Sequence, residues 1–121
     1  MLHNILISSG ELIDKITILK IKCSVINNEN NINQLENLLN IYNQISEDLR
    51  IKILPLEEDL FSVNKVIWKY ENIVRSNISD EKFIESAKCI FEFNQKRNMI
   101  KKQIDEKLNS SFFDEKKHDI Y

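Results

Sequence analysis

Three polar side chains interrupt an apolar stripe in the last helical segment of the chain. The stripe is predicted by apolar residues at helical spacing, namely Phe83, Ala87, Ile90, Ile104 and Leu108. Its middle positions are Asn94, Arg97 and Lys101. Charged groups are almost never fully buried unless they are paired. We therefore expect either an opening in the packing at this point or polar partners from other helices.

A second polar row precedes it in the sequence. The residues are spaced by four, three and four positions, which places them on one helical face: Asn64, Trp68, Glu71 and Arg75. If this face opposes that of the last helix, Glu71 can pair with Arg97, and Asn64 can bridge to Asn94.

These two faces allow two interpretations. One is a buried polar network that fixes the register of the helices and adds little net stability. The other is a pocket for a small anion, in which Arg97 holds a carboxylate or phosphate with two hydrogen bonds, Lys101 adds charge and Trp68 forms a wall. Glu71 could then position Arg97 or act as a base, so the sequence leaves an enzymatic role open. The candidate ligand-binding residues are Asn64, Trp68, Glu71, Arg75, Asn94, Arg97, Lys101, Asp14 and Lys15.

Further charged residues stand at the start of the first helix. Ser8 and Glu11 fit a capping box, and Glu11 and Lys15 can pair across one helical turn. Asp14 could instead reach an arginine of the pocket. Two carboxylates three residues apart, without a second acidic pair, are a weak metal signal, and the two histidines lie near opposite ends of the chain. We expect no metal and no cofactor.

The helices that position these residues can be placed from apolar spacing and capping signals. The first helix runs from Ser8 to about Val25, and its wide apolar surface predicts a central position. The asparagine-rich run 27–31 predicts a loop, because asparagine favours turns and caps, and a second helix begins near Ile32.

The second half of the chain has less certain boundaries. Asn43 to Ser46 indicates a corner, and Pro55 predicts a kinked or restarted helix. Ser79 caps a last helix that ends near Leu108, and residues 109–121 form a short tail that could dock onto the body through its aromatic residues.

The fold class that follows is an all-α antiparallel bundle in a single domain over residues 1–121. It has three long helices, or four if the segment around Pro55 is split. One glycine and one proline are too few for the turns of an all-β fold. The last helix would span about 43 Å and the first about 27 Å, so the overhang leaves apolar surface uncovered. A homodimer is expected for that reason.

Composition excludes other partners. The net charge is −2 and no basic stripe is present, which argues against nucleic-acid binding. No apolar stretch approaches the length of a membrane span. Cys23 and Cys89 stand among apolar neighbours, as core thiols do, and a cytoplasmic protein is expected.

Several segments, covering nearly the whole chain, carry a family resemblance. They are the run Gly10–Leu19 (GELIDKITIL), Val63-Asn64 with Trp68, Glu71 and Arg75, Asn94 with Arg97, Ile100 and Lys101, and Glu115-Lys116 with Tyr121. Together they resemble a bacterial family of short all-helical proteins classed as a domain of unknown function. Lys20, Asn72 and Gln95 stand where that family has acidic residues, and His118 where it has an aromatic one. The resemblance implies an all-helical fold and no particular activity.

Two functions remain from the sequence. The first is a small cytoplasmic interaction or assembly protein, dimeric and with an internal polar network. The alternative is a protein that binds or acts on a small anionic metabolite, such as a sugar phosphate or a carboxylate.

Overall fold

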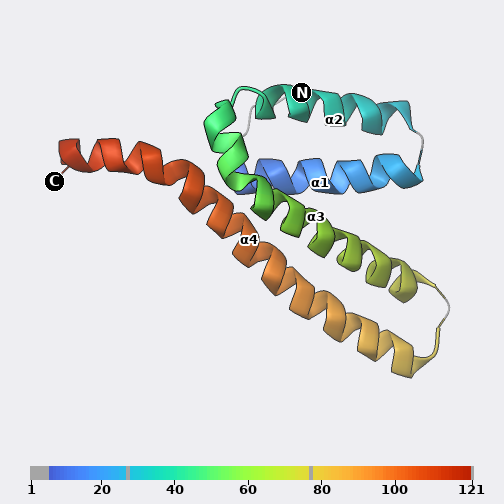
Figure 1. The fold of residues 1–121 in the computed structure, drawn as a ribbon. Helices are drawn as coiled ribbons and strands as arrows, with labels where there is room; N and C mark the ends of the chain where they lie inside the picture. Colours follow the sequence, from blue (N-terminus) through green and yellow to red (C-terminus); the bar gives the residue numbers. More distant parts are fainter. Residues whose placement is uncertain (1–5, 27, 77, 121) are drawn as a thin grey trace.

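Four helices make up the computed structural model, which describes residues 6–26, 28–76 and 78–120, with side chains up to Asn109. They are α1 (Ser9–Val25), α2 (Glu29–Tyr42), α3 (Glu47–Arg75) and α4 (Asp80–Ile120). Helices α1 and α2 form one antiparallel pair, and α3 and α4 form a second, longer pair (Figure 1). The prediction of an all-α antiparallel bundle is confirmed, with four helices.

Helix α1 is the central element, as its wide apolar surface predicts. It contacts each of the other three helices. Its buried apolar residues are Leu12, Ile13, Ile16, Leu19 and Ile21. The predicted cap is also present, because the Ser8 Oγ accepts a hydrogen bond of 3.2 Å from the backbone N–H of Glu11.

Helix α2 begins earlier than predicted. It starts at Glu29 rather than near Ile32, and the side chain of Asn28 accepts a hydrogen bond of 2.8 Å from the backbone N–H of Asn30. The asparagine-rich run therefore provides a helix cap and a first turn, since asparagine is among the best N-cap residues. Asn27 lies outside the described residues.

Helix α3 starts at the predicted corner and passes through its proline. Ser46 caps it, with its Oγ 3.4 Å from the backbone nitrogen of Leu49. The helix continues through Pro55 without a restart. Figure 1 shows that the first turns of α3 run in a different direction from the rest. Pro55 has no N–H to donate to the carbonyl of Ile51, and a hydrogen bond missing at this point explains such a bend.

Helix α4 is longer than predicted. The Oγ of Ser79 caps it at 3.4 Å from the backbone nitrogen of Lys82. Its backbone stays helical past Leu108 to Ile120, so the separate tail predicted for 109–121 is wrong in this range. The chain has no glycine or proline in this stretch that would end a helix. The predicted docking of the tail's aromatic side chains lies outside the described residues.

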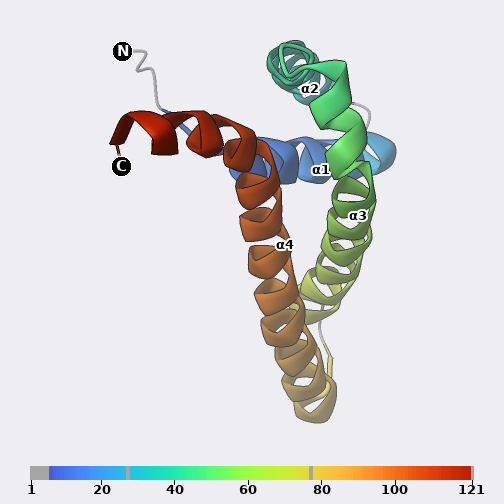
Figure 2. The ribbon, with the colours of Figure 1, turned by 60° about the vertical axis from the view of Figure 1, so that its left-hand side comes forward.

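The apolar core joins α1, α3 and α4. Its buried cluster consists of Ile13, Ile53, Leu60, Ile104 and Leu108. This cluster fixes where α1 crosses the α3–α4 pair, and the polar residues of the site lie beside it. Figure 2 shows this crossing from a second side, with α1 lying across the α3–α4 pair.

The start of the predicted α4 stripe is wrong. Phe83 and Ala87 are exposed, and Ser86 is buried in their place. Ser86 and Ile104 are 18 residues apart, which is five steps of 3.6 residues, the period of a straight helix. The predicted stripe from Phe83 to Ile104 has a spacing of 3.5 residues, so it drifts off the buried face towards the start of α4.

No helix in the described part of the chain combines the length and hydrophobicity needed to cross a bilayer.

Candidate functional site

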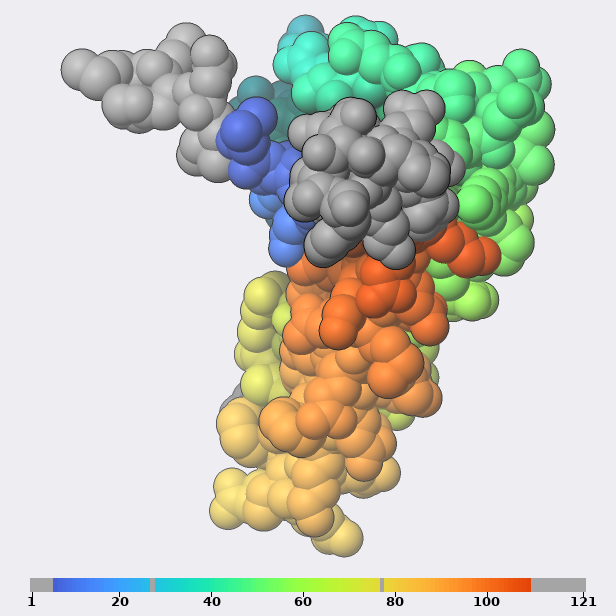
Figure 3. Space-filling view, turned by 90° about the vertical axis from the view of Figure 1, so that its left-hand side faces the viewer, coloured from blue at the N-terminus to red at the C-terminus, as the bar shows by residue number. Residues whose placement is uncertain are grey.

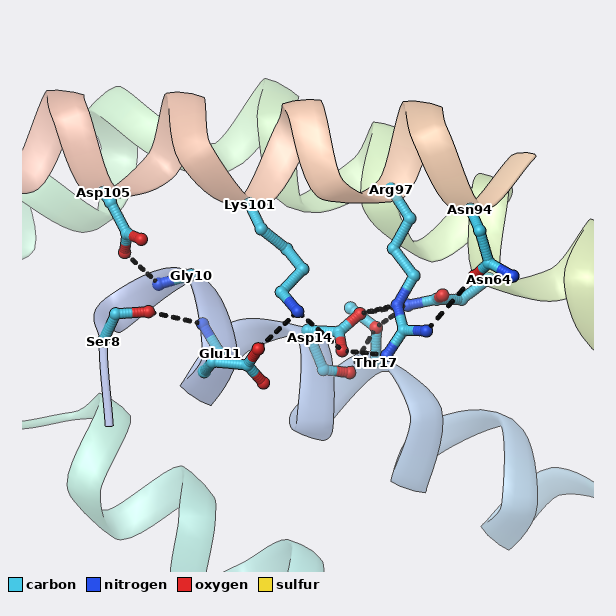
Figure 4. Close-up of polar contacts among 10 residues, drawn as sticks. All are labelled: Ser8, Gly10, Glu11, Asp14, Thr17, Asn64, Asn94, Arg97, Lys101 and Asp105. Carbon is cyan, nitrogen blue, oxygen red and sulfur yellow. Dashed lines mark hydrogen bonds and ion pairs between the residues drawn. The ribbon is translucent and has the colours of Figure 1, made fainter. Parts of the chain in front are cut away.

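A buried carboxylate lies at the centre of the polar residues. Asp14 of α1 is 1% exposed. Arg97 of α4 donates to it from two nitrogens, Nε to Oδ1 at 2.8 Å and Nη2 to Oδ2 at 2.5 Å. This is a bidentate ion pair, the strongest arrangement between these two groups. Figure 4 shows Arg97 reaching from α4 onto Asp14.

Helix α3 contributes an amide to the same carboxylate. The Nδ2 of Asn64 donates to Asp14 Oδ1 at 2.9 Å and to Thr17 Oγ1 at 2.7 Å. The hydroxyl of Thr17 in turn donates to the backbone oxygen of Asp14 at 2.8 Å. Polar groups from three helices therefore satisfy one another in the interior.

A second ion pair lies one turn towards the N-terminus of α1. Lys101 Nζ is 2.5 Å from Glu11 Oε1 and 3.9 Å from Asp14 Oδ2. Next to it, the backbone N–H of Gly10 donates to Asp105 Oδ1 at 2.6 Å. A Cβ at Gly10 would overlap the carbonyl of Lys101. Gly10 therefore allows the backbones of α1 and α4 to approach closely at this point.

The surroundings of Asp14 and Arg97 keep both side chains charged. Burial by itself raises the pKa of Asp14, but the hydrogen bonds from Arg97 and Asn64 and the charges of Arg97 and Lys101 outweigh it, so the pKa lies below its ordinary value. The hydrogen bond to Asp14 raises the pKa of Arg97. Asp14 is thus an ionised, fully engaged structural carboxylate, not a group poised to accept a proton.

Polar partners from other helices therefore explain the interrupted stripe. The expectation that Asp14 could reach an arginine of the pocket is confirmed, whereas the predicted pairs Glu71–Arg97 and Asn64–Asn94 are wrong. Arg97 pairs with Asp14, while Glu71 lies 4.0 Å from Arg75 in its own helix. Asn64 does not bridge to Asn94, whose Oδ1 accepts from Arg97 Nη1 at 3.4 Å. The cause is the arrangement of the helices, because α1 rather than α3 faces Arg97 most directly.

Asp14 also changes what Arg97 can do for a ligand. Two of the five N–H groups of Arg97, one on Nε and one on Nη2, already serve Asp14. A ligand could therefore be held only through the remaining N–H groups of Nη1 and Nη2, and the two-bond grip stays a prediction. Nη1 has only the long contact to Asn94. Lys101 is likewise engaged by Glu11.

One predicted site residue lies elsewhere. Lys15 is exposed and lines a groove on the side of α1 that faces α2, beside Gln34 and Asn37. The predicted pair between Glu11 and Lys15 is replaced by the pair with Lys101. Helical phase accounts for this, since Asp14 points to α4 and its sequence neighbour points about 100° away.

Two members of the network were missed from the sequence. Thr17 lies one turn after Asp14 on the same face of α1, and Asp105 lies one turn after Lys101 on α4. Each could have been found from that spacing, because residues three or four apart in a helix share a face.

A cleft of about 330 Å³ opens beside the network between α1, α3 and α4. Five predicted residues line it: Asn64, Trp68, Glu71, Arg75 and Arg97. Lys22 of α1 also lines the cleft and was not predicted. The structure thus brings these side chains together around one concave surface, while Asp14 lies behind Arg97 in the interior.

In the described part of the chain, no three His, Cys, Asp or Glu residues are grouped so that they could hold a metal ion. Of the carboxylates near the cleft, Asp14 is fully engaged and Glu71 stands beside Arg75. The arrangement is therefore suited to holding helices together and to binding an anion.

Fold and site together define a small all-α protein in which buried ion pairs tie one helical hairpin across another. The chain belongs to the family of unknown function DUF6165, whose model matches residues 3–120. No curated protein and no solved structure matches it. The resemblance to a family of unknown function is thereby confirmed at the level of the family.

Proposed function

We propose that this protein is a small assembly module that forms a homodimer through the outer face of α4. The Asp14 network would serve as its internal frame, since every strong donor and acceptor in it already has a partner within the chain. The observation that carries the proposal is an exposed apolar row on α4.

The α4 row consists of Phe83, Ile84, Ala87 and Phe91, which share one face of the helix. Its three large members are between 47% and 66% exposed. They line a shallow hollow, with Lys88 and Glu92 at its edge. Single exposed apolar residues are ordinary, but a contiguous apolar patch rimmed by charges is typical of an interaction surface.

The place of the row in the molecule supports the same conclusion. The α3–α4 pair extends beyond α1 and α2 as an arm of two helices (Figure 1). Figure 3 shows the first half of α4, in tan and orange, on the surface of this arm. Two helices alone leave part of each apolar face open, and a second pair of helices would complete a four-helix bundle.

A second copy of this chain is the occupant that the row fits best. Lys88 and Glu92 lie one turn apart along the edge of the row. When two copies of α4 run antiparallel about a two-fold axis that passes near residue 90, Lys88 of each copy comes opposite Glu92 of the other. The two Phe91 side chains would then meet at the centre of a short antiparallel coiled coil.

The test is the oligomeric state of the full chain and of two charged variants. Phe91→Glu places a carboxylate in the row, and Ile51→Glu places one at an equally exposed apolar site on α3, where Ile51 is 62% exposed. We expect the wild type and Ile51→Glu to be dimers by light scattering over a concentration series. Phe91→Glu should dissociate at least about tenfold more readily, because a charge would have to be desolvated.

Circular dichroism of both variants checks that the helices are intact. A wild type that stays monomeric at high micromolar concentration would overturn the proposal. So would a Phe91→Glu protein that dimerises as well as Ile51→Glu does.

A cytoplasmic location belongs to the same proposal. Cys23 and Cys89 are free thiols and both are half-buried. Free cysteines are typical of proteins kept in a reducing compartment.

A further inference from the structure

The cleft between α1, α3 and α4 combines an apolar lining with positive charge. Its apolar residues are Ile18, Ile21, Ile67 and Trp68. Three cations line it, Lys22, Arg75 and Arg97, against the one acidic side chain of Glu71. Arg97 is balanced by Asp14 behind it, so the charge available to a ligand comes mainly from Lys22 and Arg75.

Arg75 is held loosely. Its side chain is 71% exposed, and its contact with Glu71 at 4.0 Å is at the limit of an ion pair. Exposed pairs of this kind contribute about 0–1 kcal/mol. Arg75 can therefore turn to an anionic ligand with little loss of stability.

Lys22 and Arg97 add donors that are not fully used. Among the described residues, Lys22 has no ion-pair partner. Arg97 has a side chain that is 26% exposed, and its Nη1 has only the 3.4 Å contact to Asn94, which is longer than an ordinary hydrogen bond. Because Asp14 fixes the guanidinium on its other edge, this N–H group is presented in a set orientation.

We propose that the cleft binds a small molecule made of an apolar ring and one phosphate or carboxylate group. The ring would lie against Trp68 and the isoleucines, and the anionic group would lie among Arg75, Lys22 and the outer N–H of Arg97. The volume of about 330 Å³ is near the lower end of the range for ligand pockets, which calls for a small ligand. Ile18 and Trp68 are the two half-buried apolar residues of the cleft, and they favour a hydrophobic ring over a sugar in that part of it.

The chain has a single tryptophan, and it lines the cleft, so intrinsic fluorescence reports on the site directly. The probes are phenyl phosphate and benzoate, with benzyl alcohol as the neutral match, a hexose phosphate as the polar-ring match and inorganic phosphate as the anion alone. We expect a saturable change in Trp68 fluorescence with the first two probes. Benzyl alcohol, the hexose phosphate and inorganic phosphate should all bind more weakly than phenyl phosphate.

The variants Arg75→Gln and Lys22→Gln test the contacts. Each should weaken phenyl phosphate binding about tenfold through loss of a charge-assisted hydrogen bond. Lys52→Gln removes the same charge from an exposed position of α3 outside the cleft and should bind like the wild type. Because Arg75 is exposed, its variant should melt at the wild-type temperature, which separates a binding role from a structural one.

Three results would overturn this assignment. They are no fluorescence response to phenyl phosphate or benzoate, equal binding of benzyl alcohol, and unchanged affinity in both Arg75→Gln and Lys22→Gln. Tighter binding of the hexose phosphate than of phenyl phosphate would overturn the proposal that the ligand carries an apolar ring. The α4 row is a different surface, so the dimer experiment can fail without affecting this one.

Discussion

Asp14 is the residue on which most of the polar contacts converge. A carboxylate with 1% exposure is costly to bury, and its partners offset that cost only because they act together. Arg97 supplies two hydrogen bonds and Asn64 a third. Such a network adds little net stability over an apolar core, but it penalises any packing in which these helices meet elsewhere.

Removing the arginine should be far more damaging than its partial exposure suggests. In Arg97→Gln, Asp14 stays buried and keeps the hydrogen bond from Asn64, but the one cation left beside it among the described residues is Lys101, at 3.9 Å. We expect a loss of about 3 kcal/mol in the free energy of unfolding, measured by urea denaturation. The double variant Asp14→Asn/Arg97→Gln should lose less than the sum of the two single variants.

Arg75→Gln is the matched control for this loss, since it removes an exposed arginine from α3. Its unfolding free energy should stay within about 0.5 kcal/mol of the wild type. If the Arg97→Gln protein were equally stable, the buried pair would not be part of what holds the hairpins together.

At the scale of elements, Gly10 sets how closely α1 approaches α4. Gly10→Ala would press a methyl group onto the Lys101 carbonyl, which is backbone and cannot swing away. Helix propensity favours alanine by up to about 1 kcal/mol, but overpacking of this kind costs about 1–3 kcal/mol. We expect a net loss of stability, measured by urea denaturation. We also expect a weaker hydrogen bond from the backbone N–H of residue 10 to Asp105, measured by faster amide exchange at residue 10.

Asn30→Ala tests helix propensity alone, because Asn30 is exposed in the first turn of α2. It should be neutral or slightly stabilising. A Gly10→Ala protein that gained as much as Asn30→Ala would show that α1 can move away from α4 freely.

Local signals were enough to predict most helix boundaries. The caps at Ser8, Ser46 and Ser79 each involve a side chain and a backbone N–H three residues away, so they can be read from a short window. The end of α4 could not be read in this way. The predicted end near Leu108 follows the last residue of the apolar stripe, but no glycine or proline stops the helix there and α4 continues to Ile120.

The sequence predicted which residues belong to the site better than it predicted which of them contact one another. Helical spacing placed Asn64, Trp68, Glu71 and Arg75 on one face, and these residues do line one cleft with Arg97. Spacing does not say which helix faces which, because that depends on the crossing of α1 over the α3–α4 pair. The sequence therefore offered both Glu71 of α3 and Asp14 of α1 as partners for an arginine of the pocket, and in the structure Asp14 holds Arg97.

At the scale of the whole molecule, two carboxyl groups give the stability opposite dependences on pH. The pKa of Asp14 is lowered in the folded state, so its contribution is present above the ordinary aspartate pKa of about 4 and is lost as the pH falls through the lowered value. Burial raises the pKa of Glu57, despite the hydrogen bond from Tyr42, so its contribution is present at low pH and is lost as the pH rises through the raised value.

We therefore expect the unfolding free energy to fall as the pH drops below about 4, because Asp14 then binds a proton in the unfolded chain while it is still ionised in the folded protein. Urea denaturation at a series of pH values measures this slope. Asp14→Asn should flatten the acid limb, and Glu57→Gln should remove the opposing change at higher pH. If the unfolding free energy of Asp14→Asn fell as steeply in acid as that of the wild type, the loss of stability at low pH would come from other carboxylates.

The ties between α1 and α4 also set when the protein can fold during synthesis. Asp14 and Arg97 are 83 residues apart in the chain, and Gly10 and Asp105 are 95 apart. A nascent chain whose residue 105 is still inside the ribosome holds a finished first hairpin with an unmatched carboxylate on its apolar face. Docking of that hairpin must therefore await the synthesis of α4 as far as residue 105, which makes the fold dependent on long-range closure.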